Sequence, residues 1–148
     1  MNKKSIDAPQ LLLENQICFP LYSAANAVVR AYRPLLEKLD ITYLQYIVLM
    51  VLWEESSLMV KELGQRLDLD SGTLTPLLKR LEAKGLVERR RSEEDERARI
   101  ITLTRRGQAL KAKAEGIPSD MACTVGLTPA KGLQLKQLCD ELVAALEE

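Results

Sequence analysis

Residues 69–81 read LDSGTLTPLLKRL, and this segment decides the fold of the chain. It predicts a helix that runs to about Lys84, because its leucines recur at the spacing of one helix face: Leu74, Leu77, Leu78 and Leu81. Pro76 is compatible with this helix because it lies in the first turn, where a missing N–H has no intrahelical partner. Gly85 follows as a left-handed stop signal. Residues 68–73 precede the helix as a turn with capping side chains.

A second helix and two strands flank this segment. Upstream, residues 60–67 place their apolar side chains on one helix face. Downstream, residues 86–91 and 99–103 predict two short strands, joined by a charged hairpin at residues 92–98. Helix, turn, helix and hairpin, in this order, form a winged helix-turn-helix, in which the second helix enters the major groove of DNA.

The N-terminal part is predicted to be helical. Residues 8–39 have helical spacing, so we expect one long helix in which Pro20 makes a kink or marks a first-turn boundary. Thr42 and Gln45 then fit a capping box for a buried helix, which ends in a short polar turn at residues 54–57.

The C-terminal part is predicted to contain two more helices. Thr104 caps a helix that runs to about Ala114, and Thr128 opens the last helix, which runs to about Leu146. Between them, residues 117–126 are expected to be a helix end or a loop. The fold class is therefore mainly α with a small β-hairpin wing.

Composition narrows the chemistry. The chain has 148 residues, 47% of them hydrophobic and 28% charged, which is typical of a soluble globular protein. No run is long enough for a membrane span, and residues 1–7 lack the apolar core of a secretory signal, so we expect a cytoplasmic protein without a membrane partner. The chain has no histidine, three scattered cysteines and no glycine-rich phosphate loop. We therefore expect no metal, no cofactor and no enzymatic activity.

Charge is distributed unevenly along the chain. Residues 61–113 hold 14 Lys and Arg against 9 Asp and Glu, a net of +5, whereas the remainder has a net of −5. On a winged helix-turn-helix, such a basic segment favours double-stranded DNA as the partner. The residues expected to contact DNA lie at the start and on the outward face of the second helix and on the hairpin: Ser71, Thr73, Thr75, Lys79, Arg80, Arg89, Arg91 and Arg97.

Five motifs carry a close resemblance to the MarR family of winged-helix repressors, within it to the organic hydroperoxide resistance (OhrR) branch: NQICF at 15–19, LDITYLQY at 39–46, LDSGTLTPLLKRL at 69–81, GLV at 85–87 and RSEEDER at 91–97. The resemblance spans residues 10–148. It implies a homodimer on a palindromic operator, with Asp95 of the wing in the DNA-binding set. It also implies that an organic hydroperoxide is the inducer.

Cys18 is the candidate sensing residue. A peroxide is attacked by a thiolate, so a sensing cysteine needs solvent access and neighbours that favour its charged form. The resemblance implies that Tyr32 and Tyr43, and with them Tyr22, hydrogen-bond the reactive thiol. Apolar side chains are available for the organic tail of the peroxide: Phe19, Leu21 and Trp53. The alternative is that Cys18 is a small buried hydrophobic residue.

The other two cysteines differ in their surroundings. Cys123 resembles the resolving cysteine of the two-cysteine regulators in the branch, and this implies a disulfide between Cys18 of one subunit and Cys123 of the other. An ordinary packed residue is the alternative for Cys123. Cys139 lies in an apolar stripe of the last helix, which indicates interface packing.

The sequence thus predicts a peroxide-sensing repressor. Its reduced dimer binds DNA and is released when Cys18 is oxidised and Cys123 closes the disulfide. Three regions follow: residues 1–40 for dimerisation and sensing, 41–104 for DNA binding and 105–148 for dimerisation. Three alternatives stay open, namely a MarR-type repressor released by a non-covalent aromatic ligand, a thiol peroxidase and a winged-helix protein-interaction module. The absence of histidine weakens the second, and the arginine-bearing hairpin argues against the third.

Overall fold

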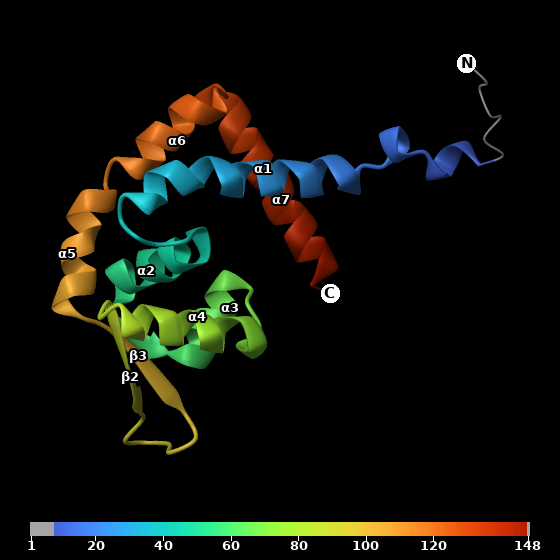
Figure 1. Ribbon diagram of the computed structural model, residues 1–148. Coiled ribbons are helices and arrows are strands. Elements are labelled where there is room, and N and C mark those ends of the chain that lie inside the picture. Colours follow the sequence, from blue (N-terminus) through green and yellow to red (C-terminus); the bar gives the residue numbers. More distant parts are fainter. Residues whose placement is uncertain (1–7, 148) are drawn as a thin grey trace.

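The computed structural model of the chain describes residues 8–147, so the expectation for residues 1–7 lies outside the described part. The helices are α1 (Cys18–Glu37), α2 (Tyr43–Glu55), α3 (Val60–Leu67), α4 (Ser71–Ala83), α5 (Arg105–Ala114), α6 (Ile117–Val125) and α7 (Pro129–Leu146). The strands are β1 (Ser57–Met59), β2 (Val87–Arg91) and β3 (Arg99–Leu103). Figure 1 shows the β2–β3 hairpin as a wing that projects below α4.

The predicted fold class is confirmed: the chain is mainly helical with a winged helix-turn-helix at its centre. The sheet is antiparallel with strand order β1-β3-β2. Strand β1 was not expected, because residues 54–57 were interpreted as a polar turn. It is only three residues long and exists through pairing with β3, where Leu58 faces Ile101. The core under the sheet is aliphatic and includes Leu49, Leu52, Leu63, Leu74, Leu78 and Leu81.

Helix α1 begins ten residues later than the pattern predicted, so the prediction of one long helix over residues 8–39 is wrong. Two short 3₁₀ helices, η1 (Pro9–Leu11) and η2 (Leu13–Asn15), occupy the first part. Amide side chains stabilise them: Asn15 Nδ2 donates to the Pro9 carbonyl at 2.7 Å, and Gln16 Nε2 donates to the Gln10 carbonyl at 2.8 Å. Pro20 lies in the first turn of α1, which selects the boundary interpretation over the kink.

Capping residues set most of the other helix boundaries. The Thr42–Gln45 capping box of α2 is present, and Thr104 and Thr128 accept main-chain N–H bonds at the starts of α5 and α7, all as predicted. Asp70 caps α4 by accepting the Thr73 N–H at 2.7 Å. The interpretation of residues 117–126 as a loop is wrong, because helix α6 occupies this segment. Gly126, with a φ of 68°, ends the helix.

Within residues 8–147, three turns use residues other than glycine at positive φ. Asp40 follows α1 with a φ of 55°, Ser56 follows α2 with 61°, and Asp68 follows α3 with 53°. L-residues rarely adopt this left-handed region. Each of these residues therefore fixes a sharp change of direction between two elements.

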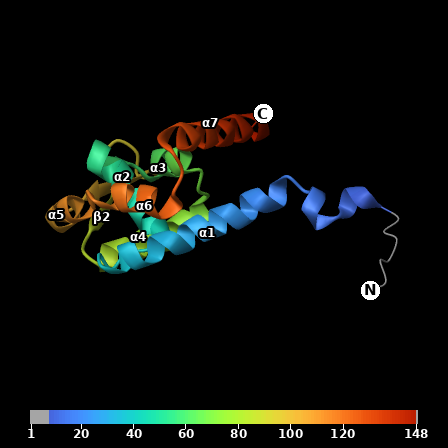
Figure 2. The same cartoon turned by 90° about the horizontal axis from the view of Figure 1, so that it is seen from above.

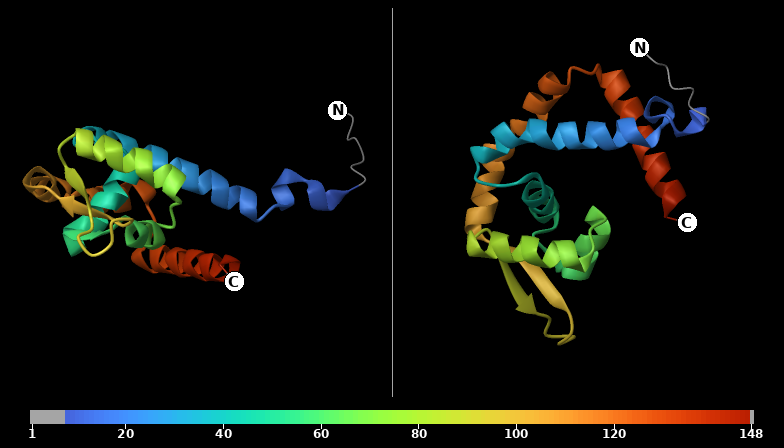
Figure 3. Two further views of the ribbon diagram at one scale, coloured as in Figure 1. Left: turned by 90° about the horizontal axis from the view of Figure 1, so that it is seen from below. Right: turned by 45° about the vertical axis from the view of Figure 1, so that its right-hand side comes forward.

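The first and last helices project from the body. Helix α6 packs against α1, whereas α7 has no buried residue and lies apart from α1 when the molecule is seen from above (Figure 2). Two further views show η1 and η2 beyond the end of the body, and α7 standing apart from α4 (Figure 3). Many large apolar side chains of α1 and α7 are exposed as a result, among them Val28, Val29, Leu135, Leu138, Leu142 and Val143.

Candidate nucleic-acid interface and cysteine site

Helix α4 presents its polar first turn to solvent. Leu74 and Leu77 are buried against the core, so the residues between them face outward. The predicted contact residues Ser71, Thr73 and Thr75 are exposed at the start of the helix. Lys79 and Arg80, also in the predicted set, are exposed one turn further on. We call α4 the recognition helix from here on.

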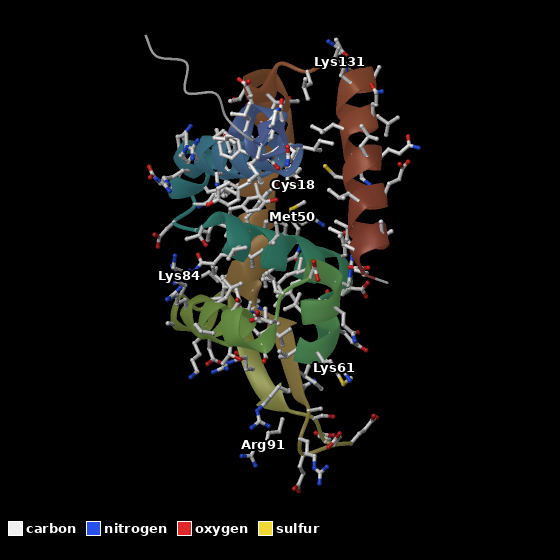
Figure 4. The ribbon with its side chains drawn as sticks, turned by 90° about the vertical axis from the view of Figure 1, so that its right-hand side faces the viewer. Cys18, Met50, Lys61, Lys84, Arg91 and Lys131 are labelled. Carbon is white, nitrogen blue, oxygen red and sulfur yellow. The ribbon has the colours of Figure 1, made fainter. Side chains whose placement is uncertain are left out.

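The tip of the wing is shaped by Asp95. Its Oδ1 accepts the N–H of Arg97 at 3.0 Å, and its carbonyl accepts the N–H of Ala98 at 3.0 Å. These bonds hold the turn that leaves the Arg97 side chain exposed. Arg91 is also exposed, near the lower end of the wing in Figure 4. Asp95 thus acts on the shape of the tip.

Arg89 is placed differently from the other predicted wing residues. Its side chain is half-buried at the base of the wing, where Nη2 lies 3.4 Å from Glu82 Oε1. The Arg89 N–H also donates to Glu82 Oε2 at 3.0 Å. Arg89 therefore ties β2 to α4, and this contact was not anticipated from the sequence.

A groove of about 1010 Å³ lies between the start of the recognition helix and the wing. Its lining includes Ser71, Asp95 and Arg97 from the predicted set, together with Lys61 and Arg99. Lys61 was missed, because its only signal was a basic residue at the start of α3. Figure 4 shows Lys61 and Arg91 toward the same end of the molecule. The groove therefore brings together side chains from α3, α4 and the wing.

Cys18 is the first residue of α1, and it is free and exposed. Tyr22, one turn further along, has 69% of its surface exposed. Phe19 and Leu21 are also exposed beside it. The alternative that Cys18 is buried is therefore wrong within this chain, where its thiol is free and exposed; Figure 4 labels its position.

The other two predicted tyrosines belong to an aromatic cluster. The ring of Tyr32 lies 4.9 Å from Tyr43 and 5.8 Å from Tyr46, and Tyr46 lies 6.3 Å from Trp53. Burial, with the neighbouring Tyr43 and Tyr46, raises the pKa of Tyr32 above its ordinary value. Burial and Tyr43 likewise raise the pKa of Tyr46. Tyr46 was not singled out, because it has the pattern of a core residue.

One chain does not bring Cys18 to this cluster. Cys18 and Tyr32 are fourteen residues apart on α1, and a rise of 1.5 Å per residue separates them by about 21 Å along the axis. Tyr43 packs against Tyr32 and is therefore at the same far end. Trp53 belongs to the cluster as well, and its Nε1 donates to the Gly107 carbonyl at 3.0 Å.

Cys123 and Cys139 are also free thiols. Cys123 is exposed in the last turn of α6, and Cys139 is half-buried on α7. Over residues 8–147, no cluster of three or more Cys, Asp or Glu side chains is arranged to hold a metal ion. No helix in that range is long and apolar enough to cross a membrane.

A winged helix-turn-helix with an exposed polar recognition helix and exposed arginines on its wing defines a DNA-binding transcriptional regulator. The family model described as transcriptional regulator SarA/Rot matches residues 30–114. The organic hydroperoxide resistance transcriptional regulator of Bacillus subtilis is 52% identical over 135 residues, which cover 91% of this chain and 90% of that relative. The chain therefore belongs to the MarR-type transcriptional regulators, among those for organic hydroperoxide resistance.

Solved structures agree with this family. Reduced AbfR bound to DNA has a TM-score of 0.77 at 38% identity, covering 97% of this chain and 100% of that one; AbfR comes from Staphylococcus epidermidis. Disulfide-formed AbfR has a TM-score of 0.64 at 41% identity, covering 88% and 92%. A MarR mutant from E. coli in complex with operator DNA reaches 0.75 at 28% identity, covering 85% and 92%. The chain thus resembles the reduced AbfR more than the disulfide form.

Proposed function

We propose that this protein is a repressor that binds operator DNA as a dimer and leaves it when an organic hydroperoxide oxidises Cys18. The observation that carries the proposal is an exposed free thiol at the start of α1, in a chain 52% identical to an organic hydroperoxide resistance regulator. Reduced AbfR, which this chain resembles, is bound to DNA in its structure. The inducer and the palindromic operator are parts of the proposal.

The dimer buries the apolar faces of the projecting helices. Val28 and Val29 of α1 and Leu138 and Leu142 of α7 are between 39% and 56% exposed in one chain. Burial of apolar surface of this extent stabilises an assembly. A symmetric second copy presents the same helices and can bury it. Residues 1–40 and 105–148 would then form the dimer, and residues 41–104 would bind DNA. Two-fold symmetry gives one recognition helix to each half of a palindrome.

The dimer also completes the sensing site. Since Cys18 and Tyr32 lie at opposite ends of α1, the phenols that meet the thiol come from the second copy. We assign this role to Tyr32 and Tyr43 of the partner subunit, and to Tyr22 as a neighbour one turn from Cys18. Burial raises the pKa of Tyr32 above its ordinary value, so this phenol keeps its proton at neutral pH and can donate to a thiolate.

The chemistry at the site has two steps. The Cys18 thiolate attacks the terminal oxygen of the hydroperoxide and the O–O bond breaks, so that the sulfur becomes a sulfenic acid and the alkoxide takes up a proton and leaves as an alcohol. The thiol of Cys123 of the partner subunit then attacks that sulfur, which forms a disulfide and releases water. The existence of a disulfide form of AbfR supports the second step. Cys139 takes no part and packs in the dimer.

DNA contacts are divided between helix and wing. Ser71, Thr73 and Thr75 reach base edges or phosphates at the start of the recognition helix, and Lys79 and Arg80 bind phosphates along it. Arg91 and Arg97 of the wing enter the minor groove or bind its phosphates, with Asp95 holding the turn. Arg89 supports the wing from its base through Glu82.

The test uses a duplex recovered by selection from a random-sequence pool with the reduced protein. Its affinity is measured before and after one equivalent of cumene hydroperoxide, for the wild-type chain and for Cys18→Ser, Cys123→Ser and Cys139→Ser. We expect oxidation to release wild type and Cys139→Ser but not Cys18→Ser, and a non-reducing gel to show a cross-linked dimer that requires both Cys18 and Cys123.

Other outcomes select the alternatives. If Cys18 oxidises without a cross-link, the protein is a one-cysteine sensor. If peroxide does not oxidise it, and an aromatic ligand releases both wild type and Cys18→Ser, the protein is a ligand-responsive repressor. Many turnovers with a thiol reductant would indicate a peroxidase.

A further inference from the structure

Lys84 joins the end of the recognition helix to the turn between α1 and α2. It is the C-cap residue of α4, and its N–H donates to the carbonyls of Arg80 and Glu82. Its side chain leaves the helix, so that Nζ donates to the carbonyl of Asp40 and, at 3.4 Å, to Gln45 Oε1. Figure 4 shows Lys84 on the flank of the molecule, between α4 and the α1–α2 turn.

Both acceptors belong to the structure that starts α2. Asp40 has a positive φ of 55°, which fixes the direction of the turn. The Gln45 side chain is buried, and its Oε1 accepts the Thr42 N–H at 3.0 Å to close the capping box. Lys84 therefore donates to the same oxygen that caps α2.

The capping box holds a residue of the proposed sensing site. Tyr43 is the first residue of α2, directly after Thr42, and its ring packs 4.9 Å from Tyr32 on α1. A change in the position of these tyrosines moves the start of α2 and the preceding turn. It therefore moves the two oxygens that Lys84 binds.

The link adds to packing that already connects α1 and α4 through α2, against which both helices pack. Helix α1 packs mainly against α2 and α6, whereas α4 packs against α2, α3 and β2. The Asp40 carboxylate lies 3.7 Å from Nζ but is 94% exposed, so the ion pair contributes little. The fixed part of the link is the bond to the carbonyl and the bond to the buried amide.

We propose that Lys84 is a positioning residue that transmits oxidation at Cys18 to the recognition helix. This inference rests on the proposed function. When the tyrosines rearrange, the α1–α2 turn shifts, and Lys84 draws the end of α4 with it. The thirteen residues of α4 make a rod about 20 Å long, so a tilt at Lys84 displaces Ser71 at the other end. Cavities of about 390 Å³ and 260 Å³ on either side of Lys84 leave its side chain room to follow.

The experiment compares Lys84→Met with a matched control. Lys84→Met keeps the aliphatic stem and removes the donor. Arg66→Met likewise removes a cation that pairs two elements, α3 and α2 through Glu54 and Glu55, but lies away from the α1–α2 turn. Affinity for the selected duplex is measured in the reduced form and after cumene hydroperoxide, and mass spectrometry verifies that Cys18 is oxidised equally in all variants.

We expect wild type and Arg66→Met to lose affinity on oxidation by the same factor, about 10–100-fold. Lys84→Met should bind within about threefold of wild type when reduced, yet lose less than about fivefold on oxidation. Lys84→Arg should restore part of the response, because it retains a long cationic donor. If Lys84 had only a structural role, its substitution would lower the DNA affinity of the reduced protein or the melting temperature. The factor by which oxidation lowers the affinity would then stay unchanged.

An equal factor in Lys84→Met and wild type overturns this inference alone. No loss in wild type, with Cys18 oxidised, overturns the proposed function and this inference together. Lys84→Gln, which is uncharged and too short to keep both bonds, repeats the test in a second side chain, so that the result does not depend on how well one variant folds.

Discussion

The indole of Trp53 donates a hydrogen bond to the main-chain carbonyl of Gly107 at 3.0 Å. This bond joins the aromatic cluster of α2 to the first turn of α5. Gly107 is buried there, against the carbonyl of Leu86 and the side chain of Leu103. The close approach of two elements at this point requires a residue without a side chain.

Gly107→Ala is therefore expected to destabilise the protein, although alanine favours helices. A Cβ at this position would lie 2.6 Å from Leu103 Cδ1 and collide with the Leu86 carbonyl. Overpacking of this kind costs about 1–3 kcal/mol. Urea denaturation followed by circular dichroism measures it. Gly116→Ala is the control, because nothing lies within 4 Å of its added Cβ; equal stability of the two variants would contradict the packing argument.

Substitution of Arg97 is expected to weaken DNA binding, whereas substitution of Arg89 is expected to lower stability. Arg97→Ala removes an exposed wing cation, so DNA affinity falls and the slope of log K against log salt decreases by about 1, with the melting temperature unchanged. Arg89→Met breaks the half-buried contact with Glu82, so the free energy of unfolding falls by about 0.5–1 kcal/mol with the salt slope retained. Salt titrations and thermal melts of both variants distinguish the roles. A reduced slope of log K against log salt in Arg89→Met would instead indicate that Arg89 contacts DNA.

Half-buried Tyr32 and buried Tyr46 predict a loss of stability at alkaline pH. The pKa of Tyr32 and the pKa of Tyr46 are raised by burial, so each group binds its proton more tightly in the folded chain. Their contribution to stability is complete below the unfolded pKa of about 10 and is lost as pH rises through the folded pKa. Unfolding free energies at pH 8 and pH 11 should differ less in Tyr32→Phe than in wild type. Tyr22→Phe, at an exposed position, is the comparison.

Mixed dimers test whether each sensing site draws on two chains. One chain carries Cys18→Ser, and the other carries Tyr32→Phe with Tyr43→Phe. In a site shared between subunits, the remaining Cys18 faces intact tyrosines and should react with cumene hydroperoxide at the wild-type rate. If the site lies within one chain, the same thiol faces only phenylalanines and should react as slowly as in the tyrosine-variant homodimer. The mixed dimers are tagged and purified, and rapid-quench experiments measure the rate at which the remaining Cys18 is oxidised. This rate distinguishes a shared site from a site within one chain.

The sequence predicted the elements whose boundaries depend on nearby residues. The caps at Thr42, Thr104 and Thr128 involve bonds over three residues, and all of them are present. Strand β1 could not be predicted in this way, because it forms through β3, about 45 positions along the chain, where Ser57 and Thr102 share a hydrogen bond. The 3₁₀ turns before α1 escaped notice because their leucines imitate a helical period.

The candidate site was predictable as residue types but not as an arrangement. Exposed hydroxyl and basic side chains on α4 follow directly from its leucine pattern. The partner of Arg89 does not, because Glu82 is on another element and nothing in the pattern marks it. The predicted helix over residues 8–39 already placed Cys18 and Tyr32 fourteen residues apart on one helix, but the packing of Tyr32 against Tyr43 and Tyr46 could not be read from it.

The turns at Asp40, Ser56 and Asp68 keep a positive φ without glycine. Asp68 lies in the left-handed αL region, where a side chain costs roughly 1–2 kcal/mol relative to glycine, so Asp68→Gly would relieve strain. The same substitution would loosen the angle at which two elements meet. The chain thus accepts a cost in stability at these turns, and in return the angles between successive elements stay fixed.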